Sequence, residues 1–252
     1  MPKTFKIQIK GRVQGVGFRP FVFNIAHQLH INWTVSNNEN GVIIKITTTS
    51  KKAHSFLETL LKKPPTTSII TATKLEEITT EDFNDFKIVS SEIVQNINIP
   101  LTPDFAICNE CKVEIKDIEN RRFNYPFTTC VNCGPRYAVT TQFPFERAHT
   151  TLSNFEMCIT CETEYKDPNN RRFHSQTNSC ADCGIQLQLV DADGKDVVID
   201  KQKLINQIAI YISEGKIIAI KNTNGYLLCC DATNPETIAQ LRFKKKRPNK
   251  PF

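Results

Sequence analysis

The sequence contains no long hydrophobic run. None of its apolar stretches approaches the roughly 18–20 consecutive residues that a helix needs to span a bilayer, and residues 1–6 lack the apolar segment of a secretory signal. We therefore expect a cytoplasmic protein with no membrane partner. With 252 residues, 40% of them hydrophobic, the chain can bury a substantial core in one to three domains.

Two common nucleotide-binding motifs are absent from the glycine-rich segment near the N-terminus. Gly11, Gly15 and Gly17 do not fit the spacing of a dinucleotide fingerprint, and no Gly-Lys-Ser/Thr follows them as in a Walker loop. The same segment contains no Cys, Ser or His that could act as a nucleophile. These absences exclude several nucleotide-dependent and covalent mechanisms at this position.

Cysteine, in contrast, is abundant and regularly spaced. Eight of the ten cysteines form four Cys-x-x-Cys pairs, with 18 residues between the first two pairs, 24 in the centre and 18 between the last two. Other residues repeat with them at an offset of 50, such as Asn120–Phe123 and Asn170–Phe173. The eight cysteines are Cys108, Cys111, Cys130, Cys133, Cys158, Cys161, Cys180 and Cys183.

In a reducing compartment this spacing predicts metal binding rather than disulfides. We expect two structural Zn²⁺ ions, each closed by four thiolates with no open position for catalysis. The repeat favours sequential sites, 108–133 and 158–183, although nested pairing is also compatible with the spacing. The paired arginines Arg121-Arg122 and Arg171-Arg172 are either phosphate ligands or, as we favour, braces for the zinc-bound sulfurs and nearby carboxylates.

Charge is distributed unevenly along the chain. Residues 1–90 carry 12 Lys/Arg and 7 Asp/Glu, residues 91–185 carry 9 and 12, and residues 186–252 carry 11 and 7. The cysteine-rich block is thus the acidic part, and bound thiolates would make it more so. Because a nucleic-acid reader is normally basic, this argues against nucleic acid as a partner of the fingers.

Hydrophobic periodicity predicts a β-α-β-β-α-β order in residues 1–91, with one extra short strand. We expect strands at 4–10, 34–37, 41–48, 69–75 and 86–89, and helices from Pro20 and over 51–61. This pattern is typical of a ferredoxin-like sandwich, so the whole chain is expected to be an α+β multidomain protein.

The glycine-rich turn between the first strand and the first helix has the geometry of a small-anion site. Backbone N–H groups converge there, the helix N-terminus adds positive potential, and Arg19 supplies a guanidinium fork. A plain glycine turn with a surface arginine is the alternative. The predicted phosphate-binding loop comprises Gly11, Arg12, Val13, Gln14, Gly15, Val16, Gly17 and Phe18.

This segment resembles the acylphosphatase signature G-x-V-Q-G-V-x-F-R at every fixed position. The resemblance implies that the loop cradles a phosphate, that Arg19 binds it, and that an asparagine orients the attacking water. Asn37 matches that asparagine, in Val35-Ser36-Asn37 followed by Gly41. The chain departs from the family at Trp33-Thr34, where Gly-Trp is usual, so Asn38 and Asn40 stay open as alternatives.

Residues 186–252 begin a third segment. We expect a hairpin around Asp191–Gly194, a helix from Leu204 ended by Gly215, strands at 217–221 and 226–230, and a helix over 235–243. These elements start an α/β domain without closing its sheet, so we expect a piece of a longer protein. The segment resembles the opening of a YrdC-like nucleotide-binding domain, which implies that Lys244, Arg247 and Lys250 bind ATP phosphates.

The order of the three parts, 1–91, 92–185 and 186–252, resembles the N-terminal part of the HypF family of hydrogenase-maturation carbamoyltransferases. That resemblance implies hydrolysis of carbamoyl phosphate, adenylation of the carbamate with ATP, and transfer to the C-terminal cysteine of the partner HypE. Three other readings stay open: a stand-alone acylphosphatase with a zinc appendage, an RNA-binding zinc protein using its basic tail, and fingers that dock the maturation partner.

Overall fold

The computed structural model describes residues 3–80, 87–89, 98–199, 203–222 and 225–251. The chain divides into two compact units, residues 1–185 and 186–252, which are considered separately. The predicted linker between Ser90 and Pro103 and the start of the strand predicted at 86–89 fall partly outside the described residues. No helix in the described ranges is both long and apolar enough to cross a membrane.

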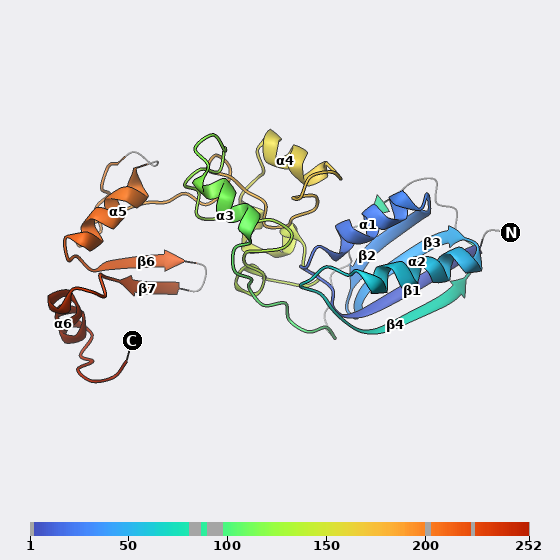
Figure 1. The fold of residues 1–252 in the computed structure, drawn as a ribbon, viewed down its shortest axis with the longest axis horizontal. Helices are drawn as coiled ribbons and strands as arrows, with labels where there is room; N and C mark the ends of the chain where they lie inside the picture. The colour runs from blue at the N-terminus through green and yellow to red at the C-terminus, as the bar shows by residue number, and fades with distance from the viewer. Residues whose placement is uncertain (1–2, 81–86, 90–97, 200–202, 223–224, 252) are drawn as a thin grey trace. The chain divides into compact units, whose positions relative to one another are not determined.

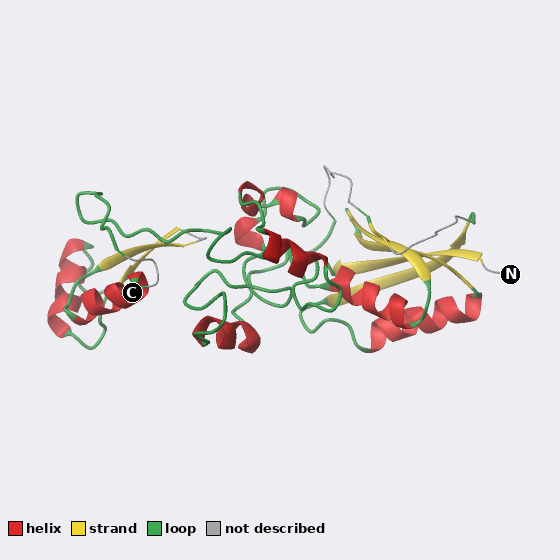
Figure 2. Cartoon of the chain, turned by 90° about the horizontal axis from the view of Figure 1, so that it is seen from above, coloured by secondary structure: helices red, strands yellow, loops and turns green. Residues whose placement is uncertain are grey.

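The first unit begins with a five-stranded sheet of order β4-β1-β3-β2-β5. Strands β1 to β4 pair antiparallel, and β5 joins β2 in parallel. Helices α1 and α2 both lie on one face of this sheet (Figures 1 and 2). The order is the predicted ferredoxin-like one, and the elements are β1 (Lys3–Arg12), α1 (Phe18–Gln28), β2 (Asn32–Asn38), β3 (Gly41–Thr48), α2 (Ser50–Lys62), β4 (Ile69–Ile78) and β5 (Lys87–Ile88).

Alternation along the strands builds the core of this sandwich. Phe5, Ile7 and Ile9 of β1 lie beside Val42, Ile44 and Ile46 of β3, and all six are buried under the helices. Helix α2 packs on this face with residues at helical spacing, and it buries Ala53, Phe56 and Leu60. Removing this much apolar surface from water is the main stabilising contribution to the domain.

Helix α1 begins at Phe18, two residues earlier than predicted. Gly17, with φ of 73°, occupies the N-cap position in the left-handed region that a residue without Cβ enters without penalty. Pro20 therefore lies inside the first turn instead of opening it. This is tolerated because the first N–H groups of a helix have no intrahelical acceptor to lose. The consequence is that Arg19 also belongs to the first turn.

The finger region consists of two copies of one short motif. Each copy has an eight-residue helix, α3 (Asn109–Lys116) or α4 (Ile159–Lys166), that starts directly after the first cysteine of its set. A turn then reverses the chain through a residue of positive φ, Asn124 at 55° and His174 at 53°. Three 3₁₀ turns connect the copies: η1 (Tyr137–Val139), η2 (Arg147–His149) and η3 (Thr151–Asn154).

The second unit holds α5 (Leu204–Ser213), an antiparallel pair β6 (Ile218–Asn222) and β7 (Gly225–Cys229), and α6 (Pro235–Lys244). The hairpin expected around residues 191–194 keeps its turn, but only an isolated bridge between Val190 and Asp196 forms. Large apolar side chains are exposed on this unit, such as Tyr226, Leu227 and Phe243. A two-stranded sheet with two short helices is too small to cover them.

The single tryptophan, Trp33, is fully buried in the ferredoxin-like core and so reports the unfolding of that domain. We predict that Phe56→Ala, at a fully buried position, lowers the free energy of unfolding by about 3–5 kcal/mol, from lost burial and the cavity left behind. Denaturant titration followed by Trp33 fluorescence measures this loss. Leu61→Ala on the exposed side of the same helix is the control, with an expected change below about 1 kcal/mol. Equal losses for the two variants would contradict this account of the core.

Candidate functional site

The eight cysteines gather in two groups, each with ligand sulfurs within 4.8 Å of one another. The groups are sequential, as the repeat favoured, and nested pairing is wrong. Three sulfur–sulfur distances inside each group lie between 3.6 and 3.8 Å. A disulfide is far shorter, whereas a tetrahedron with Zn–S bonds of about 2.3 Å has edges of about 3.8 Å. Two four-thiolate zinc sites therefore fit this chain.

The arginine pairs brace the sulfurs, but each pair braces the site of the other finger. Arg121 of the first finger donates to Cys158 Sγ at 3.3 Å and to Cys180 Sγ at 3.0 Å in the second. Arg171 of the second finger donates to Cys111 Sγ at 3.1 Å in the first. Positive guanidinium groups offset the negative charge of four thiolates around one metal, and they hold the sulfurs in place.

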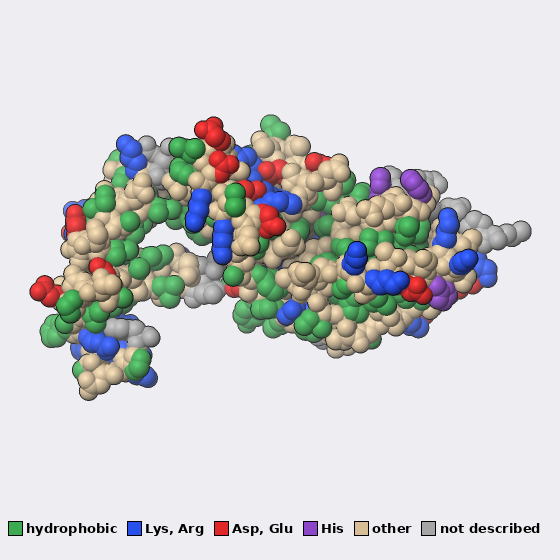
Figure 3. Space-filling view, viewed as in Figure 1, with side chains coloured by type: hydrophobic (Ala, Val, Ile, Leu, Met, Phe, Trp, Pro, Cys, Tyr) green, Lys and Arg blue, Asp and Glu red, His purple; other side chains and the backbone are tan. Residues whose placement is uncertain are grey.

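The second arginine of each pair forms an ion pair with a glutamate of the other finger. Arg122 binds Glu164 at 2.5 Å, and Arg172 binds Glu114. Burial would raise the pKa of the Glu114 carboxyl, but hydrogen bonds from Arg172 and Arg171 outweigh it and hold the pKa at about 2. Glu114 and Glu164 thus serve these internal pairs. Acidic and basic groups lie side by side around α3 and α4 (Figure 3).

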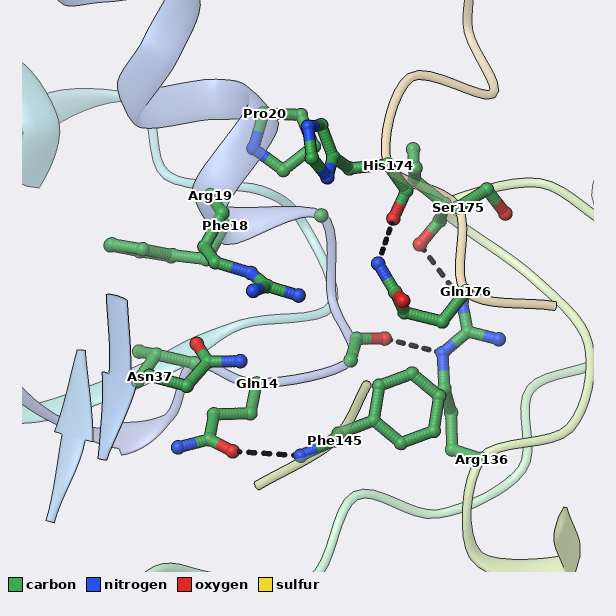
Figure 4. Close-up of a pocket in the computed structure, with 14 residues that line it drawn as sticks. Gln14, Phe18, Arg19, Pro20, Asn37, Arg136, Phe145, His174, Ser175 and Gln176 are labelled. Atoms are coloured by element: carbon green, nitrogen blue, oxygen red, sulfur yellow. Dashed lines mark hydrogen bonds between the residues drawn. The ribbon is translucent and has the colours of Figure 1, made fainter. Parts of the chain in front are cut away.

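The glycine-rich loop lies between β1 and α1 and lines a pocket with the start of α1 (Figure 4). Gly15 and Gly17 both have φ near 70°, a backbone form that lets successive N–H groups converge on one point. Val13, Gln14, Gly15, Gly17 and Phe18 line this pocket, whereas Gly11, Arg12 and Val16 do not.

Not every residue of the predicted loop faces the pocket. The guanidinium of Arg12 donates to the Thr67 carbonyl at 2.9 Å and lies over Phe105, so it serves packing. Gly11 is needed at a bulge in β1, since its φ is 117° and a Cβ there would lie 2.1 Å from the Ile69 carbonyl oxygen. Gln14 uses its amide to donate to the carbonyls of Asn38 and Gly41, which fixes the loop against the β2–β3 turn.

Arg19 and Asn37 are brought together at the pocket. Arg19 is 8% exposed and Asn37, near the end of β2, is 4% exposed, and their polar ends point into the same space (Figure 4). The alternatives to Asn37 lie outside the pocket lining. Asn38 accepts a hydrogen bond from the Asn40 amide in the tight turn before β3, so these two asparagines shape the turn.

The opposite wall of the pocket comes from the finger region, which sequence reasoning did not anticipate. Val131, Arg136, Phe145, His174, Ser175 and Gln176 line it. Arg136 is almost fully buried and connects the two parts: it donates to the Gly15 carbonyl of the loop and to the carbonyls of Cys130, Val131 and Cys133 at the first zinc site. Burial lowers its pKa to about 10, which still leaves it charged near neutral pH.

Two further contacts join the finger region to the loop and to α1. The Phe145 amide donates to the side-chain oxygen of Gln14 at 3.2 Å, and Arg19 forms an ion pair with Glu146 at 2.7 Å. His174, Ser175 and Gln176 occupy the positions of Asn124, Tyr125 and Pro126 in the first repeat. The two repeats therefore carry different side chains at the three positions where the second repeat lines the pocket.

The residues predicted to bind nucleotide lie in the second unit, at and after the end of α6. Lys244 and Lys250 are exposed, and Arg247 follows the helix in a turn that Arg242 holds by donating to the carbonyls of Arg247 and Lys250. Their role in binding nucleotide remains a prediction.

Comparison with known proteins divides the chain in the same way. Family models match at residues 5–88 (Acylphosphatase), 107–140 and 157–190 (HypF finger), and 211–252 (Telomere recombination, the Sua5/YciO/YrdC group). An acylphosphatase of Thermotoga maritima is 37% identical over 87 residues, which are 34% of this chain and 96% of that protein.

Longer relatives match all three parts at once. Carbamoyltransferase HypF of Synechocystis sp. is 45% identical over 253 residues, covering 100% of this chain and 33% of the relative. A crystal structure of full-length HypF in the phosphate- and nucleotide-bound form superposes with a TM-score of 0.91 at 39% identity, covering 100% of this chain and 32% of that one. The chain thus spans about a third of the length of these relatives.

The crossed arginines generate a prediction about metal retention. We expect Arg121→Ala to weaken zinc binding by roughly ten-fold or more at the second site, to which Arg121 donates, and Arg171→Ala to do so at the first. Maleimide labelling during slow chelation, read by peptide mapping, shows which cysteines are exposed first. Lys116→Ala, an exposed cation in the first finger, is the charge-matched control. If zinc were lost first from the finger that carries the substitution, this would contradict the finding that each arginine supports the site of the other finger.

His174 gives a prediction on pH. Burial, followed by the nearby charge of Arg19, lowers the pKa of its imidazole from 6.5 to about 4. The unfolded chain therefore binds this proton at a higher pH than the folded chain. The contribution of the neutral His174 to the free energy of unfolding is fully present above about pH 6.5 and is lost as the pH falls toward 4. An NMR titration should show an imidazole signal with a pKa near 4 that is missing in His174→Gln. A His174 signal titrating near 6.5 would contradict the burial of this ring.

Proposed function

This chain carries the N-terminal region of the HypF carbamoyltransferase family, and on that premise we propose that its loop pocket hydrolyses carbamoyl phosphate. The observation that carries the proposal is that Arg19 and Asn37 line one pocket together with the glycine-rich loop. This loop lies within residues 5–88, which match the acylphosphatase family model. A relative crystallised with phosphate, matched along this whole chain, supports a phosphate site in the shared fold.

The chemistry proposed is attack of water on the mixed anhydride of carbamoyl phosphate, which yields carbamate and inorganic phosphate. The Arg19 guanidinium and the amides of Gly15 and Gly17 would hold the phosphoryl oxygens, where negative charge develops. Asn37 would orient the attacking water through its carboxamide and would not act as a base. The loop contains no side chain that would form a covalent intermediate.

The fingers would contribute structure to this reaction. Zn²⁺ bound by four thiolates cross-links short segments that have little core of their own and offers no open position to a substrate. Through Arg136, the first site fixes the carbonyl of Gly15 and hence the shape of the loop. A zinc-supported wall over the pocket therefore fits the role of a rigid enclosure for the substrate.

The later steps are proposed from the family. Carbamate would be activated by ATP in the YrdC-like part, to which Lys244, Arg247 and Lys250 would contribute contacts to the phosphates, and the carbamoyl group would pass to the C-terminal cysteine of HypE. Residues 211–252 match the start of this part, and the chain covers about a third of its relatives. We therefore expect hydrolysis, and not the complete transfer, from these 252 residues.

We predict that Arg19→Ala lowers phosphate release from carbamoyl phosphate by at least about 100-fold, because the fixed positive charge at the phosphoryl group is lost. Malachite-green detection of phosphate measures this, with acetyl phosphate as the second substrate. Lys10→Ala, an exposed cation of β1, is the charge-matched control and should retain activity.

Two results would count against the proposal. Substantial turnover by a folded Arg19→Ala chain would rule out the loop as the reacting site. Equal kcat/KM for carbamoyl and acetyl phosphate would favour a general acylphosphatase over a carbamoyl-phosphate enzyme.

A further inference from the structure

Glu146, a residue of the finger region, binds the arginine of the phosphate loop. Its carboxylate accepts a hydrogen bond from Arg19 Nη1 at 2.7 Å, across 127 positions of sequence. Both side chains are largely buried, at 9% and 17% exposed, so the pair is weakly screened by solvent. A contact of this kind fixes where the guanidinium lies.

The carboxylate binds Arg19 from outside the pocket. Arg19 lines the pocket, as does Phe145, but Glu146 is not part of the lining. Nη1 of the guanidinium is the atom engaged with Glu146. A guanidinium has five N–H donors in a planar fork, so the edge formed by Nε and Nη2 can still hold two phosphate oxygens. Glu146 therefore need not be displaced when a phosphate binds.

The backbone on both sides of Glu146 is held in place. On one side the Phe145 amide donates to Gln14 of the loop. On the other side the Arg147 amide donates to the side chain of Gln176 at 2.7 Å, and the Arg147 guanidinium donates to the carbonyls of Gln176, Asn178 and Phe155. A carboxylate anchored in this way restricts the side-chain freedom of the flexible arginine that it binds.

We propose that Glu146 is a positioning residue for Arg19, so that the finger region completes the phosphate site. The proposal rests on the function proposed above for this pocket and adds a residue to it. An Arg19 side chain that is already held in its binding conformation loses less conformational entropy when it binds the phosphoryl group. A carboxylate that competed with phosphate for the arginine would have the opposite effect, since its removal would tighten binding.

The test compares Glu146→Gln and Glu146→Asp with wild type in the full 252-residue chain. Isothermal titration with inorganic phosphate gives the affinity of the site, and acetyl phosphate hydrolysis gives kcat and KM. We expect Glu146→Gln to weaken phosphate binding and to raise KM by roughly ten-fold, as for the loss of a hydrogen bond between charged groups. Glu146→Asp, which keeps the charge on a shorter side chain, should recover part of the loss. Glu119→Gln, an exposed carboxylate of the first finger, is the matched control and should behave as wild type.

The outcomes separate the two proposals. A wild-type chain that binds phosphate but hydrolyses no acyl phosphate would refute the proposed function, and the phosphate titration would still test Glu146. Unchanged or tighter phosphate binding by Glu146→Gln, with two zinc ions per chain and a wild-type circular dichroism spectrum, would overturn the positioning role. Weaker binding that Glu146→Asp does not improve at all would also overturn it, because a positioning carboxylate should be partly replaceable.

Discussion

The exchange of arginines between the two fingers is the interaction on which the centre of this molecule depends. Each finger is short, and the apolar cluster of the first consists of its four cysteines and Ile107. Arg121 and Arg171 cross from one finger to the sulfurs of the other, and Glu164 and Glu114 receive the second arginine of each pair. Because removing one partner of a buried ion pair leaves an uncompensated charge, neither finger is independent of the other.

Both fingers of this exchange also contact the pocket. The first zinc site supplies three carbonyls to Arg136, which in turn holds the Gly15 carbonyl of the phosphate loop. The second finger supplies His174, Ser175 and Gln176 to the same wall. Both fingers thus reach the pocket, through different residues of the repeated motif. The first four-cysteine site and the glycine-rich loop are linked through the hydrogen bonds of one buried arginine.

Much of this could be predicted because the signals are local. Alternating apolar residues defined the strands of the first domain, since side chains on a strand alternate between two faces. The spacing of the cysteines gave the sequential sites, and the duplicated motif gave the bracing role of its arginines. The start of α1 was misplaced because Pro20 was taken as the first helical residue, while Gly17 supplies the cap. The strands around residues 191–194 did not form because only the turn had strong local preferences.

The sequence by itself determined the ferredoxin-like order, the two four-cysteine sets and the loop that ends at Arg19. These depend on periodicity, spacing and backbone preferences within short windows. Only the tertiary structure decided which finger each arginine serves, that Asn37 rather than its neighbours faces the pocket, and that Arg136 and Glu146 reach the phosphate loop. Those contacts join residues separated by 37 to 127 positions. Patterns within short windows of sequence cannot pair such distant residues, whereas the folded chain pairs them because a buried charged or polar group needs a partner.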